Sequence, residues 1–186
     1  MKQEIALTWM SISHIRQLYN NLESQKKYDG LTEEEKQVDD IWLDEMNNEG
    51  EIAVNKLMVF YWIERVVERN DQPVFPAHIK RIKINLDIDL YNEFKYHHNI
   101  AKKYDDRIQR WMGKSPKSYT LPVLRKFKKQ YPDDMDYHRT IEYRKVNDSS
   151  DSALEKLISH VLEQVSLQDI NMLIRELEKT DYFDEK

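Results

Sequence analysis

The sequence contains no cysteine, three glycines and five prolines in 186 residues, and it has no long hydrophobic run. Without cysteine there are no disulfide bonds, no thiol catalysis and no cysteine-based zinc site. The longest apolar run, residues 57–63, is far shorter than the roughly 20 residues that cross a bilayer. The first nine residues include Glu4 and lack an apolar stretch, so we expect no secretory signal and a cytoplasmic protein.

What is present indicates a folded chain. Hydrophobic residues make up 40% of the sequence and eleven residues are tyrosine, which argues against global disorder although 34% of residues are charged. The length suits one domain with a proper core or two small domains. Gly30, Gly50 and Gly113 each follow an amphipathic stretch, where a helix commonly ends in a residue that tolerates positive φ.

These glycines divide the N-terminal part into three predicted helices. The first covers about residues 11–27, and Ile5 and Trp9 are candidates to extend its apolar face. The second opens at Thr32, which with Glu35 has the spacing of a capping box. The third covers about residues 52–69 and is apolar nearly all round, which is typical of a central helix. The narrow inner stripe expected for the second helix consists of Val38, Ile41, Trp42, Glu45 and Met46.

Residues 81–95 change from strict apolar/polar alternation to helical spacing with no glycine or proline between. The apolar set of the strand includes Ile82, Ile84 and Leu86, so the other face carries Arg81, Lys83 and Asn85. A strand that leads directly into a helix is therefore predicted. The cationic and amide-bearing face suits contacts with phosphates and base edges.

This segment resembles the start of a ribbon-helix-helix DNA-binding module, whose pattern is R-I-x-I-x-L, an acidic pair, then L-Y-x-x-F/L-K. The resemblance covers residues 81–112. It implies that two chains pair their strands into a ribbon that enters the major groove, with Arg81, Lys83 and Asn85 reading bases. It also implies a second helix that begins near Asp105 or Asp106. The glycine-containing turn of the family is missing here, so one uninterrupted helix is the alternative.

Charge is distributed unevenly around the net charge of −5. Residues 95–131 contain eleven basic and two acidic residues, whereas the segments on either side are each acidic. This distribution is typical of a chain that binds a polyanion through one segment. The alternative is that the basic segment pairs with the acidic flanks inside the fold. The residues expected to contact phosphates are Lys102, Lys103, Arg107, Arg110, Lys114, Lys117, Arg125, Lys126, Lys128 and Lys129.

Beyond Gly113, a short helix is predicted over about residues 120–131, and alternation over residues 139–146 predicts a second strand. If this strand paired with residues 81–90, it would compete with an intermolecular ribbon. Residues 147–152 are read as a polar linker, followed by helices over about 153–165 and 167–177 that either close the core or dimerise. The fold class is mainly α with a small β element, with segments 1–72, 73–131 and 132–186.

Two carboxylate patterns are candidates for an active site. Asp87 and Asp89 share a side only if the strand persists through both, and helix N-terminal acids explain them as well. Pro132-Asp133 followed by Glu142 to Lys145 resembles a PD-(D/E)xK nuclease pattern, but its lysine is out of register because position 144 is arginine. The histidines show no metal-ligand spacing. We therefore expect no enzymatic activity, no cofactor and no metal.

The preferred interpretation is a dimeric double-stranded-DNA-binding protein, such as a regulator or accessory factor of a mobile element. The rival is an inhibitor or adaptor whose acidic helices occupy a basic site on another protein. Residues 32–51 contain nine acidic residues and one lysine, which could imitate a phosphate track. RNA binding by the basic segment is a third alternative.

Overall fold

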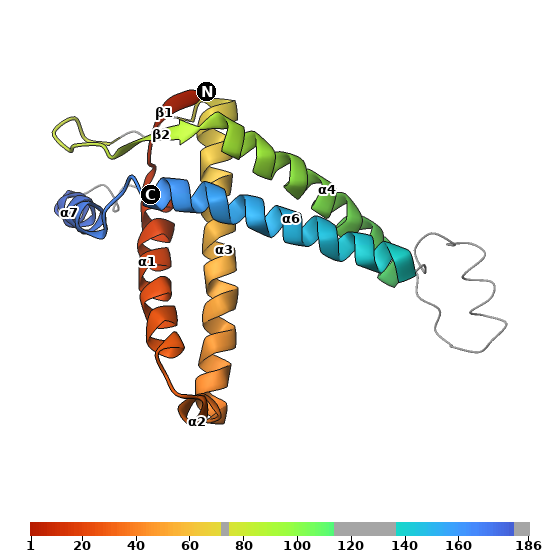
Figure 1. Ribbon diagram of the computed structural model, residues 1–186. Helices are drawn as coiled ribbons and strands as arrows, with labels where there is room; N and C mark the ends of the chain where they lie inside the picture. Colours follow the sequence, from red (N-terminus) through yellow and green to blue (C-terminus); the bar gives the residue numbers. More distant parts are fainter. Residues whose placement is uncertain (72–74, 114–136, 181–186) are drawn as a thin grey trace. The chain divides into compact units, whose positions relative to one another are not determined.

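The computed structural model describes residues 1–71, 75–113 and 137–180, with helix positions but not side chains for 104–113 and 137–144. It is mainly helical with a small two-stranded antiparallel sheet, as the sequence predicts (Figure 1). The elements are β1 (Lys2–Ala6), α1 (Trp9–Asp29), α2 (Glu33–Lys36), α3 (Asp39–Arg69), β2 (Lys83–Asp87), α4 (Ile88–Gly113), α6 (Tyr137–Leu162) and α7 (Leu167–Glu178).

The chain forms two compact units. The first contains residues 1–88 and 154–186, and the second contains residues 89–153. Both boundaries fall inside helices, after the first residue of α4 and in the C-terminal half of α6. In the second unit, Tyr91, Phe94 and Ala101 of α4 and Ser150 and Ala153 of α6 are buried. The first unit carries the candidate site.

The core of the first unit lies between α1 and α3, which run side by side (Figure 1). The apolar stripe predicted for the first helix is confirmed, because Ile12, Ile15 and Leu18 are fully buried. Fully burying a side chain of this size contributes about 1.5–3 kcal/mol. From α3, the buried side chains are those of Ile52, Val59, Phe60, Ile63 and Val66.

The C-terminal helical pair closes this core, which is one of the two alternatives that the sequence left open. Ser166 caps α7 by accepting a hydrogen bond from the backbone N–H of Asp169 at 3.0 Å. The Tyr19 hydroxyl of α1 lies 2.9 Å from the carbonyl oxygen of Leu162 and also contacts that of Val165. The α7 side chains buried against this unit are Ile170, Leu173, Ile174 and Leu177.

The prediction of a helix end at Gly50 is wrong, because α3 continues through it from Asp39 to Arg69. A glycine inside a helix costs only about 1 kcal/mol relative to alanine, and cooperative helix propagation from the packed residues after position 50 tolerates that cost. The left-handed C-cap falls instead on Asn70, with φ of 51°. Gly30 does cap α1, but with φ of −79° it does not use the freedom that distinguishes glycine.

The first strand was also not foreseen. Ile5, a candidate to extend the first helix, lies in β1 and pairs with Ile84 of β2. Its side chain is buried, as a helical position would also predict, so the hydrophobic pattern could not separate the two alternatives. The helix begins only at Trp9, after the N-cap Thr8.

The strand predicted over residues 139–146 and the linker over 147–152 are both wrong, because α6 is one helix through both. Residues 137–152 contain neither glycine nor proline. Helix propagation is cooperative, so weak helix formers such as Asn, Asp and Ser adopt helical conformation when the residues on either side are helical. The predicted helix over 120–131 lies outside the described residues.

The strand-to-helix junction is confirmed, but the helix break implied by the ribbon-helix-helix resemblance is wrong. β2 ends at Asp87 and α4 begins at Ile88 without a connecting residue. Helix α4 then continues to Gly113, so Asp105 and Asp106 lie inside one helix rather than before a second one. Asp87 closes the strand and Asp89 lies in the first helical turn, so the strand does not persist through both carboxylates.

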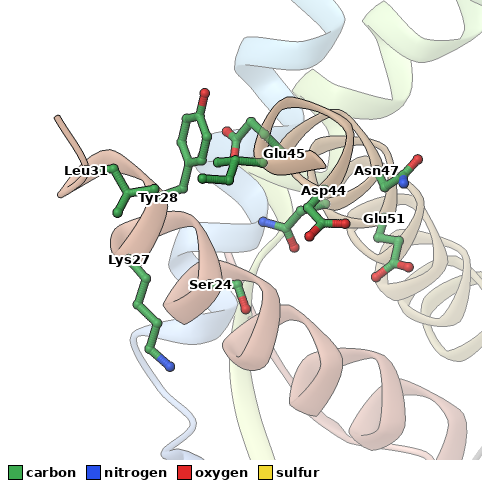
Figure 2. Close-up of a pocket in the computed structure, with 10 residues that line it drawn as sticks. Ser24, Lys27, Tyr28, Leu31, Asp44, Glu45, Asn47 and Glu51 are labelled. Carbon is green, nitrogen blue, oxygen red and sulfur yellow. The ribbon is translucent and has the colours of Figure 1, made fainter. Parts of the chain in front are cut away.

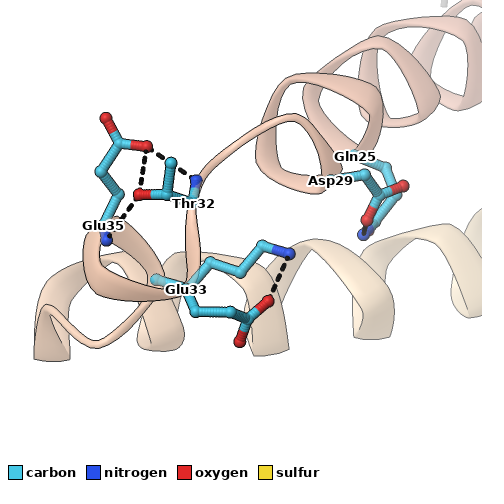
Figure 3. Close-up of polar contacts among 6 residues, drawn as sticks. Gln25, Asp29, Thr32, Glu33 and Glu35 are labelled. Atoms are coloured by element: carbon cyan, nitrogen blue, oxygen red, sulfur yellow. Dashed lines mark hydrogen bonds and ion pairs between the residues drawn. The ribbon is translucent and has the colours of Figure 1, made fainter.

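The predicted capping box at Thr32 is confirmed (Figure 3). The Thr32 N–H donates to Glu35 Oε2 at 2.7 Å, and the Glu35 N–H donates to Thr32 Oγ1 at 3.3 Å. The helix it opens is short, because α2 ends at Lys36 and α3 starts afresh at Asp39. Two helices thus replace the single second helix expected from the sequence.

Acid is expected to weaken this capping box. The hydrogen bonds from the Thr32 backbone and hydroxyl lower the pKa of Glu35. A carboxyl whose pKa is lower in the folded state contributes stability above its unfolded pKa, and that contribution is lost as the pH falls through the folded pKa. An NMR titration should therefore show Glu35 titrating at lower pH in the unmodified protein than in Thr32→Ala, which lacks the hydroxyl donor. Identical titration of Glu35 in the two proteins would contradict the capping geometry.

Candidate functional site

The three residues expected to read bases are exposed, but their strand is already paired within the chain. Arg81 precedes β2, and Lys83 and Asn85 project from its exposed face. Antiparallel pairing joins β2 to β1 with Lys83 opposite Ala6 and Lys2 opposite Asp87. Lys83 also forms an ion pair with Glu4, with Nζ 2.7 Å from Oε1. At least one of the three is therefore engaged in a contact on the sheet itself.

The second edge of β2 is occupied by side chains from the end of α6 and from the turn that follows it. The Asn85 N–H donates to Gln164 Oε1 at 2.8 Å, and the Asn85 carbonyl accepts from Gln164 Nε2 at 3.3 Å. The Asp87 N–H lies 3.1 Å from His160 Nε2. A ribbon between two copies would need one free strand edge, and pairing through the 85–87 edge would displace the side chains of both His160 and Gln164.

The expected phosphate contacts are only partly within the described structure. Lys102 and Lys103 are exposed on α4. Arg107 and Arg110 lie in the same helix, in the part whose side chains are not described. The other six lie outside the described residues: Lys114, Lys117, Arg125, Lys126, Lys128 and Lys129.

A second charged surface lies at the other end of the first unit, on α2 and the first half of α3. Over residues 33–51 only Lys36 is basic, while eight carboxylates are exposed and Glu45 is buried. We call this set the acidic face. Its exposed members are Glu33, Glu34, Glu35, Asp39, Asp40, Asp44, Glu49 and Glu51.

The same stretch also exposes large apolar side chains. Among the described residues, five of the ten exposed large hydrophobic side chains lie between Val38 and Val54. Met46 is 67% exposed, and Leu43 and Val54 are each 59% exposed. Trp42, at 47%, completes the group with Val38. The expected inner stripe of this helix is therefore largely wrong, since Val38, Trp42 and Met46 face solvent.

The outer side of α3 carries these residues in a line. At 100° per residue, Leu43, Met46, Gly50 and Val54 fall on one side of the helix. The buried residues Ile52, Val59 and Ile63 fall on the opposite side. We name the first four residues the α3 outer stripe. The sequence does not predict this stripe, because a helix end at Gly50 places Leu43 and Met46 on a different helix from Val54.

A groove beside this stripe separates α3 from α1. One hollow of about 560 Å³ is lined by the end of α1 and by Asp44, Glu45 and Glu51 (Figure 2). A second hollow of about 660 Å³ is lined by Gln17 and by α3 residues that include Met46, Gly50 and Val54. Both hollows share Asn47 and Glu51, so they follow one another along α3.

Two of the carboxylates that line this groove, Glu45 and Glu51, are held by neutral amides. Asn21 Nδ2 donates to Glu51 Oε2 at 3.1 Å, and Gln25 donates to the buried Glu45. The one basic side chain lining the first hollow, Lys27, extends away from the other lining side chains in Figure 2. Amide donors orient a carboxylate without cancelling its charge. The groove therefore keeps a negative potential.

Tyr28 fixes the corner where α1, α2 and α3 meet. Its ring lies edge-on to Trp42, with 6.3 Å between centroids, and Lys36 Nζ lies 5.3 Å from its centroid. Within the described chain, the buried hydroxyl oxygen has no hydrogen-bond partner. Burial, followed by the negative charge of Glu45, raises the pKa of Tyr28.

Tyr28→Phe is expected to leave the melting temperature unchanged or to raise it. A buried hydroxyl without a partner opposes folding, so its removal relieves that cost while the ring contacts with Trp42 and Lys36 remain. Differential scanning calorimetry of Tyr28→Phe beside Tyr28→Ala would measure this, since only the alanine variant loses the ring. A clear fall in the melting temperature of Tyr28→Phe would show that the hydroxyl is bonded.

The described residues contain neither a metal-binding cluster nor a membrane-spanning helix. No group of three or more His, Asp or Glu side chains there is arranged to hold a metal ion. Among the same residues, no helix is both long enough and apolar enough to cross a membrane.

Comparison with known proteins adds no further constraint. No family model, no curated protein and no solved structure matches this chain significantly.

Proposed function

We propose that this protein is an interaction protein, an adaptor or inhibitor, which binds a basic region of another protein through the acidic face and the α3 outer stripe. The observation that carries the proposal is the coincidence of eight exposed carboxylates with exposed Leu43, Met46 and Val54 on one stretch of chain. Carboxylates accelerate the encounter with a basic partner and select against acidic ones. Exposed apolar side chains supply the area whose burial stabilises the complex.

The apolar side chains distinguish this surface from a simple imitation of a phosphate track. A nucleic-acid backbone presents charge at regular intervals and no aliphatic groups, whereas this surface alternates the two. We therefore expect the partner surface to be basic and partly apolar. A basic site on a nucleic-acid-binding protein fits this description if apolar side chains lie beside its lysine and arginine side chains.

Charge removal tests the proposal directly. The probe is a fluorescent helical peptide of lysine, arginine, leucine and alanine, followed by anisotropy with the full chain at low and physiological salt. Asp40→Asn with Asp44→Asn should weaken binding about fivefold, because exposed ion pairs each contribute about 0.2–1 kcal/mol. The control, Asp148→Asn with Asp151→Asn, removes the same charge from exposed positions on α6. Equal losses in both variants, or no binding at low salt, would refute the proposal.

The basic segment supports a second candidate, binding of double-stranded DNA. Lys102 and Lys103 are exposed. They belong to residues 95–131, which contain eleven basic and two acidic residues. In this case random duplex DNA would bind at low salt, and each phosphate contact would steepen the log-log salt dependence by about 0.9. Lys102→Glu with Lys103→Glu should reduce that slope. Absence of duplex binding at low salt would exclude this candidate.

A further inference from the structure

The α3 outer stripe has the length and shape of a binding site for one helix. Leu43 to Val54 covers twelve residues, and the eleven steps between them extend roughly 16 Å, about three turns of helix. Its members recur at intervals of three or four, the spacing that accepts an amphipathic helix laid along the axis. The side of α3 opposite the stripe packs in the core, so the stripe adds an apolar surface that folding does not use.

Gly50 makes a notch in the middle of this stripe. A Cβ at position 50 would meet no atom within 4 Å outside its own helix in the described chain. Internal packing therefore does not require glycine there, although glycine weakens the helix relative to alanine. The notch leaves room between Met46 and Val54 for a bulky side chain of a helix packed on α3.

Charge identifies the kind of helix. Projected around α3, Asp40, Asp44 and Glu51 border one side of the stripe, Glu49 borders its other side, and Asp39 lies in line with the stripe one turn before Leu43. No lysine or arginine occurs between Lys36 and Lys56. A second copy of α3 would bring two such acidic borders together, which opposes self-pairing. A helix with cationic side chains beside its apolar face would instead be complementary to both borders.

The groove gives those cations somewhere to reach. The two hollows lie on the side of the stripe that carries Asp44 and Glu51, and Met46, Gly50 and Val54 line the second one. A lysine or arginine stem can cover apolar surface while its charged end approaches a carboxylate. An apolar anchor on the stripe and a cation over the groove are thus compatible with one helix.

We infer that the partner presents a basic amphipathic helix that lies along the α3 outer stripe, with one large apolar side chain at Gly50 and cationic side chains over the α1–α3 groove. The inference rests on the proposed function and specifies its partner. It requires helical spacing of the apolar residues of the partner, which the proposed function alone does not.

Two peptides of identical composition separate the inference from the proposal. Both contain the same numbers of lysine, arginine, leucine and alanine. One carries leucines at i, i+3, i+4 and i+7, and the other distributes them around the helix. Anisotropy with the full chain should give about tenfold tighter binding of the first peptide, equivalent to one well-buried leucine. Equal affinities would overturn the inference and leave the proposed function standing, whereas no binding of either would overturn both.

Matched variants locate the site. Met46→Gln with Val54→Gln should remove the preference for the amphipathic peptide, whereas Met172→Gln, at a methionine of α7 that is 50% exposed, should keep it. Sedimentation velocity on the unbound protein tests whether a second copy of the chain binds the stripe instead of a partner helix. Self-association that Met46→Gln with Val54→Gln abolishes would overturn the inference, because the stripe would then bind a second copy.

Gly50→Ala separates an effect on binding from an effect on folding. It should raise the melting temperature, because alanine is the better helix former. It should also weaken binding of the amphipathic peptide severalfold, because its methyl group fills the notch. A variant that is more stable and binds the peptide as well as the unmodified protein would exclude Gly50 as the contact point and overturn the inferred docking position.

Discussion

Replacing Leu86 with alanine is expected to lower the free energy of unfolding by about 2–5 kcal/mol. Leu86 is fully buried on the inner face of β2, where the strand meets the core of the first unit. Truncation removes apolar contacts and leaves a cavity, and both effects destabilise the folded state. Urea denaturation followed by circular dichroism gives the measurement.

Leu43→Ala is the matched control, because it makes the same substitution at a leucine that is 59% exposed on the α3 outer stripe. Its effect on unfolding should stay within about 0.5 kcal/mol, since exposed positions away from caps and cores contribute little. Comparable losses in the two variants would mean that the stripe is buried in the protein as it exists in solution.

The same denaturation experiment tests how the sheet is formed. A β2 strand paired with β1 of its own chain makes the unfolding midpoint independent of protein concentration. A ribbon shared by two chains would make the midpoint rise with concentration, as for any obligate dimer. Repeating the Leu86 series at concentrations a hundredfold apart distinguishes the two arrangements, and a strong concentration dependence would contradict the intrachain sheet.

Replacing Tyr19 with phenylalanine is expected to destabilise the protein by roughly 1–2 kcal/mol. The hydroxyl of Tyr19 is the donor that meets the carbonyl oxygens of Leu162 and Val165 at the end of α6. These carbonyls lie at and beyond the last residue of the helix, where intrahelical donors are missing. Removing one hydroxyl therefore loosens the attachment of the C-terminal helices to α1.

Tyr96→Phe is the control for this substitution, because Tyr96 is 64% exposed on α4. Its loss of one hydroxyl should leave the free energy of unfolding nearly unchanged. Hydrogen exchange of the α7 amides gives a second measurement, since these should exchange faster in Tyr19→Phe than in the parent protein. Unchanged stability and unchanged exchange in Tyr19→Phe would show that the contact contributes nothing.

Alkali should affect the same contact. Burial raises the pKa of Tyr19, so the neutral hydroxyl is favoured in the folded protein. Its contribution is complete below the pKa of an unfolded tyrosine and is lost as the pH rises through the folded value. The difference in stability between the parent protein and Tyr19→Phe should therefore shrink in strong alkali.

Several elements could be predicted from local pattern alone. The stripe of Ile12, Ile15 and Leu18, the capping box at Thr32 and the direct passage from β2 to α4 are all found in the structure. Each depends on residues within a few positions of one another, where period and capping chemistry decide the outcome. The C-terminal helices with their cap at Ser166 belong to the same class.

The candidate site could be predicted only in part. The acidity of residues 33–51 is visible in the sequence, but the exposure of Met46 and Val54 on one continuous helix is not. Gly50 and the alternating residues 139–146 each carry a local signal that points away from a long helix. Cooperative helix propagation overrode both signals.

The sequence by itself determined where helical and alternating patterns occur and how charge is distributed. It also excluded disulfide bonds, thiol catalysis and cysteine-based metal sites. Only the tertiary structure decided that β2 pairs with β1, that His160 and Gln164 occupy its other edge, and that the α3 outer stripe remains outside the core. The physical reason is that a strand edge or an apolar helix face specifies a need for a partner but not the partner. Which segment meets that need depends on contacts between residues about 80 positions apart, as between Glu4 and Lys83.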